Sequence, residues 1–129
     1  MHRSRLVALV IDCKTDDVDA AARFWSCAFG RPVNPSEPDS PNYRELKTEG
    51  DEMMLLVQKV EHPSRVHLDI ETDDIDAEVK RLEALGAKRV GFVTRWWVME
   101  APTGQRFCVV RPQRGSLEGR ANVWGDEGA

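Results

Sequence analysis

The strongest constraint on the fold of this chain is a segment that occurs twice. Residues 68–77 (LDIETDDIDA) align without a gap on residues 11–20 (IDCKTDDVDA), at an offset of 57 positions, and six of the ten aligned residues are identical. In a chain of 129 residues an offset of this size leaves room for two copies. The repeat therefore predicts a domain built from two related modules and excludes a solenoid.

Each copy combines a strand with a helix. Residues 65–71 alternate apolar and polar side chains, which predicts a strand with His67 on its polar face. Apolar residues then recur at helical spacing from Ile75 to Leu85, after Asp73 or Asp74 as the cap and before a terminating glycine, Gly86. The first copy repeats this pattern, with a strand and then a helix over about residues 16–29 that ends at Gly30.

The remaining segments read mainly as strands. Apolar patterning predicts them over residues 5–12, 43–48, 53–60, 88–92, 95–100 and 105–111. The four prolines of residues 31–42 predict a loop. Glycines and alternating charges in residues 113–129 predict a loosely ordered C-terminal tail, in which Trp124 is the residue able to dock. Each module thus has a strand, a helix and two or three further strands, which is an α+β arrangement.

Composition narrows the function classes. A hydrophobic content of 41% and a charged content of 31% are typical of a soluble globular domain. The net charge of −4, with dispersed basic residues, argues against a nucleic-acid surface, and the apolar run 6–11 is too short for a membrane span or a signal peptide. Cys13, Cys27 and Cys108 form no metal-motif pair, which predicts reduced thiols in a cytoplasmic protein, with Cys27 as a small core residue.

Two motifs resemble one superfamily over roughly residues 5–112. Residues 66–87 are similar to the opening of the second module in the glyoxalase/bleomycin-resistance/dioxygenase superfamily, also called vicinal oxygen chelate proteins. Residues 101–110 (APTGQRFCVV) resemble its closing hairpin, with Ala101 in place of the usual Asp and Gln105 in place of the usual Asn. Residues 23–25 (RFW), followed by a glycine, resemble the first helix of the glyoxalase-like domain branch.

The resemblance implies a specific architecture. We expect a single glyoxalase-like domain over residues 1–112, made of two βαβββ modules at about 5–60 and about 65–112. In this superfamily such modules form a cupped mixed sheet with the helices on its convex face. Homodimers are common in the superfamily, and the exposed sheet edges of the two modules make a homodimer our expectation here as well.

The resemblance also assigns four metal-ligand positions. Metal-dependent members place His or Gln and then Glu on the first and last strands of each module. In this chain those positions hold His67 and Cys108 in the second module, and Val10 and Gln58 in the first, with Leu56 competing with Gln58. Because valine binds no metal and cysteine replaces a glutamate, we expect no cofactor. A divalent metal at His67, Gln58 and Cys108 stays open as the alternative.

Two further pairs of residues are candidates. Trp96 and Trp97 are adjacent on a strand and so face opposite sides, one toward a helix and the other toward the concave side, where it could stack on a ligand. Asp12 and Asp69 hold equivalent positions in the repeat, which favours a structural role over acid–base chemistry.

Two hypotheses of function follow. In the first, the protein binds a small organic molecule without a catalytic metal, in a cup that is lined by His67, Gln58, Cys108, Trp96 and Trp97. In the second, it is a lyase, isomerase or dioxygenase of the glyoxalase type with an atypical metal site centred on His67. The substitutions at the ligand positions favour the first hypothesis. Under either, the partner is a small molecule and neither a nucleic acid nor a membrane.

Overall fold

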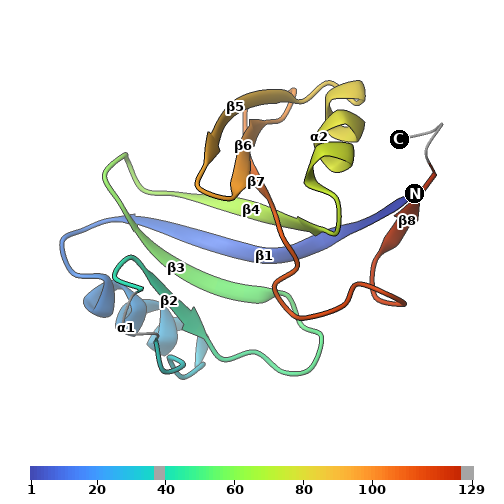
Figure 1. Ribbon diagram of the computed structural model, residues 1–129. Helices are drawn as coiled ribbons and strands as arrows, with labels where there is room; N and C mark the ends of the chain where they lie inside the picture. Colours follow the sequence, from blue (N-terminus) through green and yellow to red (C-terminus); the bar gives the residue numbers. More distant parts are fainter. Residues whose placement is uncertain (37–39, 126–129) are drawn as a thin grey trace. The chain divides into compact units, whose positions relative to one another are not determined.

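A computed structural model describes residues 1–36 and 40–125 (Figure 1). Its elements are β1 (His2–Lys14), α1 (Val18–Phe29), β2 (Tyr43–Leu46), β3 (Met54–Val60), β4 (Arg65–Thr72), α2 (Ile75–Ala84), β5 (Lys88–Val93), β6 (Trp96–Glu100), β7 (Arg106–Val110) and β8 (Asn122–Trp124). The strands are hydrogen-bonded in the order β2-β3-β1-β4-β7-β6-β5, and β8 also pairs with β1. This mixed sheet with two helices confirms the predicted α+β class. No helix in the described ranges is long and apolar enough to cross a membrane.

The chain forms two compact units. One unit is Ala8–His67, and the other combines Met1–Val7 with Leu68–Ala129. Strands β1 and β4 each contribute residues to both units. The start of the chain therefore belongs to the same unit as its second half.

In the unit Ala8–His67, β1 pairs in parallel with β3, and β3 pairs antiparallel with β2. Helix α1 begins after Asp17, whose side chain accepts a hydrogen bond from the Ala20 amide, and ends at Gly30 in the left-handed conformation (φ 68°) that glycine adopts readily. Val18 and Ala22 of α1 bury their side chains against Val57 of β3. The predicted helix end is confirmed.

One prediction about α1 is wrong. Cys27, expected in the core, is exposed. The buried side of the helix is the one that carries Val18 and Ala22, with Trp25 packed against it, and Cys27 lies outside that stripe because of its position in the helical repeat. Apolar residues occupy most of the circumference of this helix, so their pattern alone does not separate its buried face from its exposed one.

The other unit repeats the same strand pairing. Strand β4 pairs in parallel with β7, and β7-β6 and β6-β5 are antiparallel. Helix α2 begins after Asp74, which caps the amide of Ala77, and packs Val79 and Leu82 against Met99 and Val109 of the sheet. In both units the first strand therefore lies beside the last strand of its copy, and this shared topology is what the sequence repeat encodes.

The same unit buries a charged network. Glu78 of α2 is fully buried, and its Oε1 lies 2.8 Å from Nε2 of His2, itself 3% exposed. Arg81, one turn further along α2, donates from Nε and Nη2 to the two carboxylate oxygens at 2.9 and 2.7 Å. Burial alone would raise the pKa of Glu78, but the hydrogen bonds from Arg81, His2 and Ser4 outweigh it and hold that pKa below its ordinary value.

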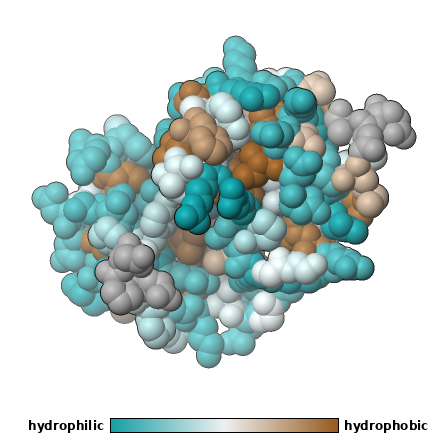
Figure 2. All heavy atoms as spheres, viewed as in Figure 1, coloured by the Kyte–Doolittle hydropathy of each residue, from teal (hydrophilic) through white to brown (hydrophobic). Residues whose placement is uncertain are grey.

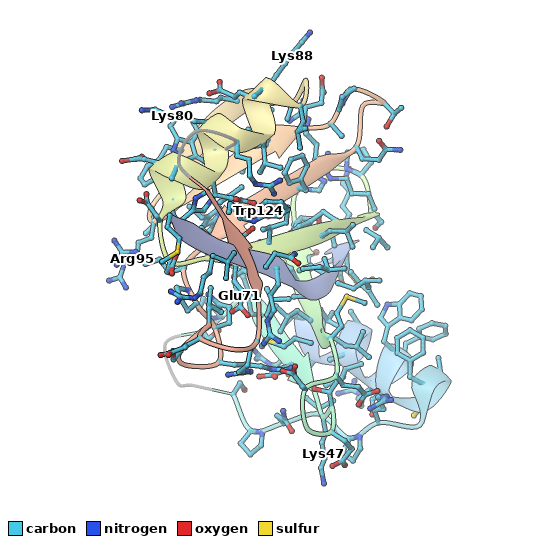
Figure 3. All side chains as sticks on the ribbon, turned by 90° about the vertical axis from the view of Figure 1, so that its right-hand side faces the viewer. Lys47, Glu71, Lys80, Lys88, Arg95 and Trp124 are labelled. Atoms are coloured by element: carbon cyan, nitrogen blue, oxygen red, sulfur yellow. The ribbon has the colours of Figure 1, made fainter. Side chains whose placement is uncertain are left out.

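The segment after β7 is more ordered than the sequence predicts. Leu117 is buried, and β8 pairs antiparallel with the start of β1, with Trp124 opposite His2. Trp124 lies between α2 and β1 (Figure 3), where its indole N–H donates to Oγ of Ser4 at 2.8 Å and its ring lies 3.9 Å from the Arg81 guanidinium. Residues 126–129 of the predicted tail, and 37–39 of the proline-containing loop, lie outside the described residues.

Candidate functional site

A buried carboxylate organises the polar face of the first unit. Asp12 is 2% exposed, and its Oδ2 lies 2.8 Å from Nδ1 of His67. Two further groups approach the same oxygen: Nε of Arg65 at 3.6 Å and Nε2 of His62 at 3.9 Å. A carboxylate taken out of water needs partners of this kind, because an uncompensated buried charge is strongly destabilising.

The strands explain why these residues meet. Arg65 and His67 are alternate residues of β4, so both side chains stand on one face of the sheet, and Asp12 lies near the end of β1. His62 comes from the short connector between β3 and β4. The second carboxylate oxygen of Asp12, Oδ1, is buried and has no hydrogen-bond partner among residues 1–36 and 40–125. One oxygen of the Asp12 carboxylate, Oδ2, therefore has three nitrogen-bearing neighbours, and the other is left for a further hydrogen-bond donor.

Gln58 belongs to the same unit and the same neighbourhood. The pairing of β1 with β3 places Gln58 directly opposite Asp12, and its Nε2 donates to the hydroxyl of Tyr43 at 2.9 Å. The competing position, Leu56, lies opposite Val10. Because Cys108 lies opposite Asp69 in the second copy, Gln58 and Cys108 hold equivalent positions in the repeat.

Cys108 stands on β7 and is 9% exposed. One candidate ligand atom from each of His67, Asp69 and Cys108 lies within 4.8 Å of the other two. His67 and Asp69 are alternate residues of β4, and Asp69 is opposite Cys108 in the β4-β7 register, so the grouping follows from the strand pairing itself. Asp69, for which the sequence favours a structural role, thereby joins the candidate donors.

The donor atoms of His67, Asp69 and Cys108 suit some metal ions better than others. A histidine nitrogen, a carboxylate and a thiolate are the three ligand types that zinc accepts, with a fourth position for water or substrate. A carboxylate on the second nitrogen of a ligating histidine, as Asp12 lies on Nδ1 of His67, is also usual. Hard ions such as Mn²⁺ or Mg²⁺ prefer oxygen ligands. The residues present therefore fit a zinc-like ion and fit a hard ion poorly.

The two adjacent tryptophans lie in different surroundings. Trp97 packs against the buried cluster under α2, with its ring 5.4 Å from Phe92 and 5.1 Å from the Arg89 guanidinium. Trp96 is half-buried and alternates with Val98, which lies opposite Cys108. Trp96 therefore shares the face of the sheet that carries Cys108, whereas Trp97 faces the helix.

Sequence reasoning misses three members of this site. It favours only a structural role for Asp12, and it does not single out His62 or Arg65 as site residues. Only the pairing of distant strands brings these side chains to one carboxylate. The one available signal is the equivalence of Asp12 with Asp69 in the repeat, which marks both as positions on the polar face.

This combination of two βα-containing copies and a polar site on the first and last strands of each defines a glyoxalase-type protein. The sequence model of the family described as "Glyoxalase-like domain" matches residues 8–110. The chain belongs to this family, within the glyoxalase/bleomycin-resistance/dioxygenase (vicinal oxygen chelate) superfamily. The predicted resemblance is confirmed.

Solved structures share the fold at low sequence identity. The Mn(II)-bound glyoxalase from Novosphingobium aromaticivorans is 17% identical with a TM-score of 0.57, and the match covers 92% of this chain and 45% of that one. A superfamily member from Vibrio splendidus 12B01 is 19% identical with a TM-score of 0.51, over 82% and 98% of the two chains. A single-residue variant of Streptomyces coelicolor methylmalonyl-CoA epimerase, in complex with 2-nitronate-propionyl-CoA, is 16% identical with a TM-score of 0.51, over 82% and 96%.

This chain thus spans less than half the length of the Novosphingobium enzyme. No curated protein matches the sequence with significance.

Proposed function

We propose that the protein binds a small organic molecule at the polar strand face around Asp12 and His67, without a catalytic metal. The observation that carries the proposal is the 2.8 Å contact between the buried Asp12 carboxylate and Nδ1 of His67. Such a contact fixes the orientation of the imidazole ring, and a fixed ring makes directional hydrogen bonds at low entropic cost. The pair is therefore suited to recognising a ligand.

The neighbouring side chains suit a partly apolar ligand. Gln58 and Tyr43 supply an amide and a hydroxyl beside Asp12, and Val10 and Leu56 alternate with Asp12 and Gln58 along the paired strands. A few polar groups among apolar ones are typical of small-molecule sites. Cys108, Trp96 and Trp97 belong to the other unit, and their role as ligand contacts stays a prediction from the sequence.

The preference for a metal-free site rests on the first copy of the repeat. Val10, at the position equivalent to His67, is 1% exposed and offers no donor atom. Gln58, at the position equivalent to Cys108, already donates to Tyr43. The four positions that bind metal elsewhere in the superfamily therefore hold at most two strong ligands here.

A metal-dependent lyase, isomerase or dioxygenase is the second candidate, and the grouping of His67, Asp69 and Cys108 favours it. These three residues would hold the ion, which would act as a Lewis acid on a substrate oxygen. Asp12 would then orient His67 through its Nδ1. The superfamily includes a structure described as Mn(II)-bound, although the donor set of this chain is closer to the preference of zinc.

Metal analysis separates the two candidates. Protein purified without chelators would be measured for bound Mn, Fe, Ni and Zn, alongside His67→Ala and the matched control His62→Ala. His62 approaches the same Asp12 oxygen but lies outside the donor group. We expect no stoichiometric metal in any of the three. Stoichiometric metal that is lost in His67→Ala and kept in His62→Ala would replace the first proposal with the second.

A ligand screen tests the binding proposal directly. Quenching of tryptophan fluorescence by a panel of planar, cationic and acyl-CoA compounds would be compared between the wild type, Asp12→Asn and Arg89→Ala. Acyl-CoA compounds are included because a structural relative was solved with one. A ligand should lose at least tenfold in affinity with Asp12→Asn and keep its affinity with Arg89→Ala. Equal affinities in all three proteins would exclude a contribution of the Asp12 carboxylate to ligand binding.

The cellular setting and assembly state complete the proposal. We infer a cytoplasmic location from three unpaired cysteines, one of which is exposed. We also infer a homodimer, as expected from the superfamily.

A further inference from the structure

The two oxygens of the buried Asp12 carboxylate have different surroundings. Oδ2 lies 2.8 Å from Nδ1 of His67, whereas Oδ1 is buried and accepts no hydrogen bond from any residue in the ranges 1–36 and 40–125. A buried carboxylate oxygen without a donor has lost its hydration and gained nothing in return, which costs free energy. A hydrogen-bond donor from outside the chain would recover that cost, so Oδ1 specifies one property of the ligand.

The charges around Asp12 discriminate between ionic and neutral donors. Arg65 carries a positive charge, and its Nε lies 3.6 Å from Oδ2. Because this cation already balances the single negative charge of the carboxylate, an ammonium group at Oδ1 would add a second cation close to Arg65, which is unfavourable. His62 and His67 place two further nitrogen atoms at 3.9 and 2.8 Å from Oδ2. An ionised acid is excluded more simply, since a carboxylate has no hydrogen to donate.

Burial limits the size of the donor. The Asp12 side chain is 2% exposed, and the residues beside it across the strands, Gln58 on β3 and His67 on β4, are half-buried. A donor can therefore reach Oδ1 only as a slim group. A hydroxyl is the smallest neutral donor that organic molecules carry, and its hydrogen bond to an ionised oxygen is stronger than one between neutral groups.

We propose that the ligand presents a neutral hydroxyl group to Oδ1 of Asp12, and that this oxygen selects hydroxyl compounds over amines and acids of the same skeleton. The inference rests on the proposed function, because it names the chemical class of the ligand at that site. A ligand without the hydroxyl hydrogen leaves the buried oxygen unserved, and a site built to hydrogen-bond a hydroxyl strongly rejects such an analogue.

Four probes with one skeleton test the proposal: benzyl alcohol, benzyl methyl ether, benzylamine and benzoate. At neutral pH they carry a hydroxyl, an ether oxygen without a hydrogen, an ammonium group and a carboxylate. Hydrophobic side chains lie among hydrophilic ones on the surface of the protein (Figure 2), so an aromatic probe can also bind away from the site. The readout is therefore local: the imidazole NMR signals of His67, assigned by their absence in His67→Ala.

Benzyl alcohol should bind the wild type at least tenfold more tightly than each of the other three probes. In Asp12→Asn this preference should largely disappear, because the acceptor loses its charge. Asp16→Asn is the matched control: it removes an exposed carboxylate of the same unit and should keep the preference. The comparison of the four probes on the wild type is decisive even if Asp12→Asn is too unstable to measure.

Equal or tighter binding of the ether, the amine or the acid at His67 would overturn the hydroxyl proposal and leave the proposed binding site in place. A preference for benzyl alcohol that persists in Asp12→Asn would overturn it as well, since the hydroxyl would then donate to another group. If none of the four probes shifts the His67 signals, the hydroxyl proposal fails, whereas the fluorescence screen decides the proposed function separately.

Discussion

Nδ1 of His67 and Oδ2 of Asp12 lie 2.8 Å apart, although 55 positions separate the two residues in the chain. The contact joins β1 to the start of β4 within one unit. His67, which holds one of the four metal-ligand positions of the superfamily, thereby contacts a carboxylate that is 2% exposed. The relationship gives Asp12 a structural role, and under the proposed function a ligand-binding one as well.

A double-mutant cycle measures the strength of this contact. Asp12→Ala, His67→Ala and the double variant would be unfolded in urea. Because the two side chains interact directly, we expect the double variant to lose less stability than the sum of the single losses, by about 0.5–3 kcal/mol. The pair Asp12→Ala and Glu52→Gln serves as the control and should show a coupling free energy near zero, since Glu52 pairs with Arg31 at the surface. A coupling free energy near zero for Asp12 and His67 would contradict the geometry.

Removing the charge of Glu78 should destabilise the second unit. In Glu78→Gln the partly buried guanidinium of Arg81 loses its counter-charge and the buried His2 loses its carboxylate partner, and breaking a buried ionic pair typically costs about 3 kcal/mol or more. Urea unfolding at pH 7 would measure the loss of free energy of unfolding. Glu83→Gln is the matched control, because Glu83 lies on the same helix and pairs with Arg89 at the surface.

The effect of Glu78→Gln should also depend on pH. The pKa of Glu78 is lower in the folded protein than its ordinary value of 4.5, so the folded state binds fewer protons in that range and stability rises with pH. The difference between the wild type and Glu78→Gln should be full above pH 4.5 and shrink as the pH falls through the lower folded value. A difference that stays constant down to about pH 3 would show that the carboxylate is not stabilised as described.

Strand β8 should contribute measurably through Trp124. Trp124→Ala loses the hydrogen bond to Ser4 and the contact with the Arg81 guanidinium, which together should lower the free energy of unfolding by about 2 kcal/mol. Trp124→Phe keeps a ring for Arg81 but lacks the N–H donor, so its free energy of unfolding should lie between those of the wild type and Trp124→Ala. Val123→Ala, on the same strand but 55% exposed, should have little effect. Equal losses in Val123→Ala and Trp124→Ala would argue against a specific role of the indole.

The turn between β5 and β6 offers a stabilising substitution. Val93 pairs with Trp96, so Thr94 and Arg95 form a two-residue turn, and Thr94 has a φ of 54°. A β-branched residue is strained in this left-handed region, and glycine is not. Thr94→Gly should raise the free energy of unfolding by about 0.5–1 kcal/mol. Arg95→Gly, at a position without positive φ, should not stabilise, and thermal unfolding of both variants checks the difference.

The sequence repeat predicts most of the fold because its signals are local. Helix α1 ends at Gly30 as expected, and α2 begins after Asp74, one of the two caps considered. Strand β8 is not predictable in this way, because three residues in a glycine-containing tail carry no readable alternation. Its position depends on pairing with β1, more than 100 positions earlier in the chain.

The candidate site is predictable only in part for the same reason. His67 stands out because a histidine on the polar side of an apolar strand is visible in the sequence. Its contact with Asp12 requires the folded strands, and so does the network of His2 and Glu78, since a residue so near the start of the sequence is expected to fray. Residue types can suggest which side chains carry chemistry, whereas the identity of their partners follows from tertiary structure.

Because β1 contributes residues to both units, the two units become complete at different times during synthesis of the chain. The unit Ala8–His67 is one continuous stretch, so all of its residues are available to one another once that stretch has left the ribosome. The residues that precede it, Met1–Val7, must wait for partners that are synthesised much later, among them β8. Completion of the discontinuous unit should therefore be the late, slow step of maturation in the cell.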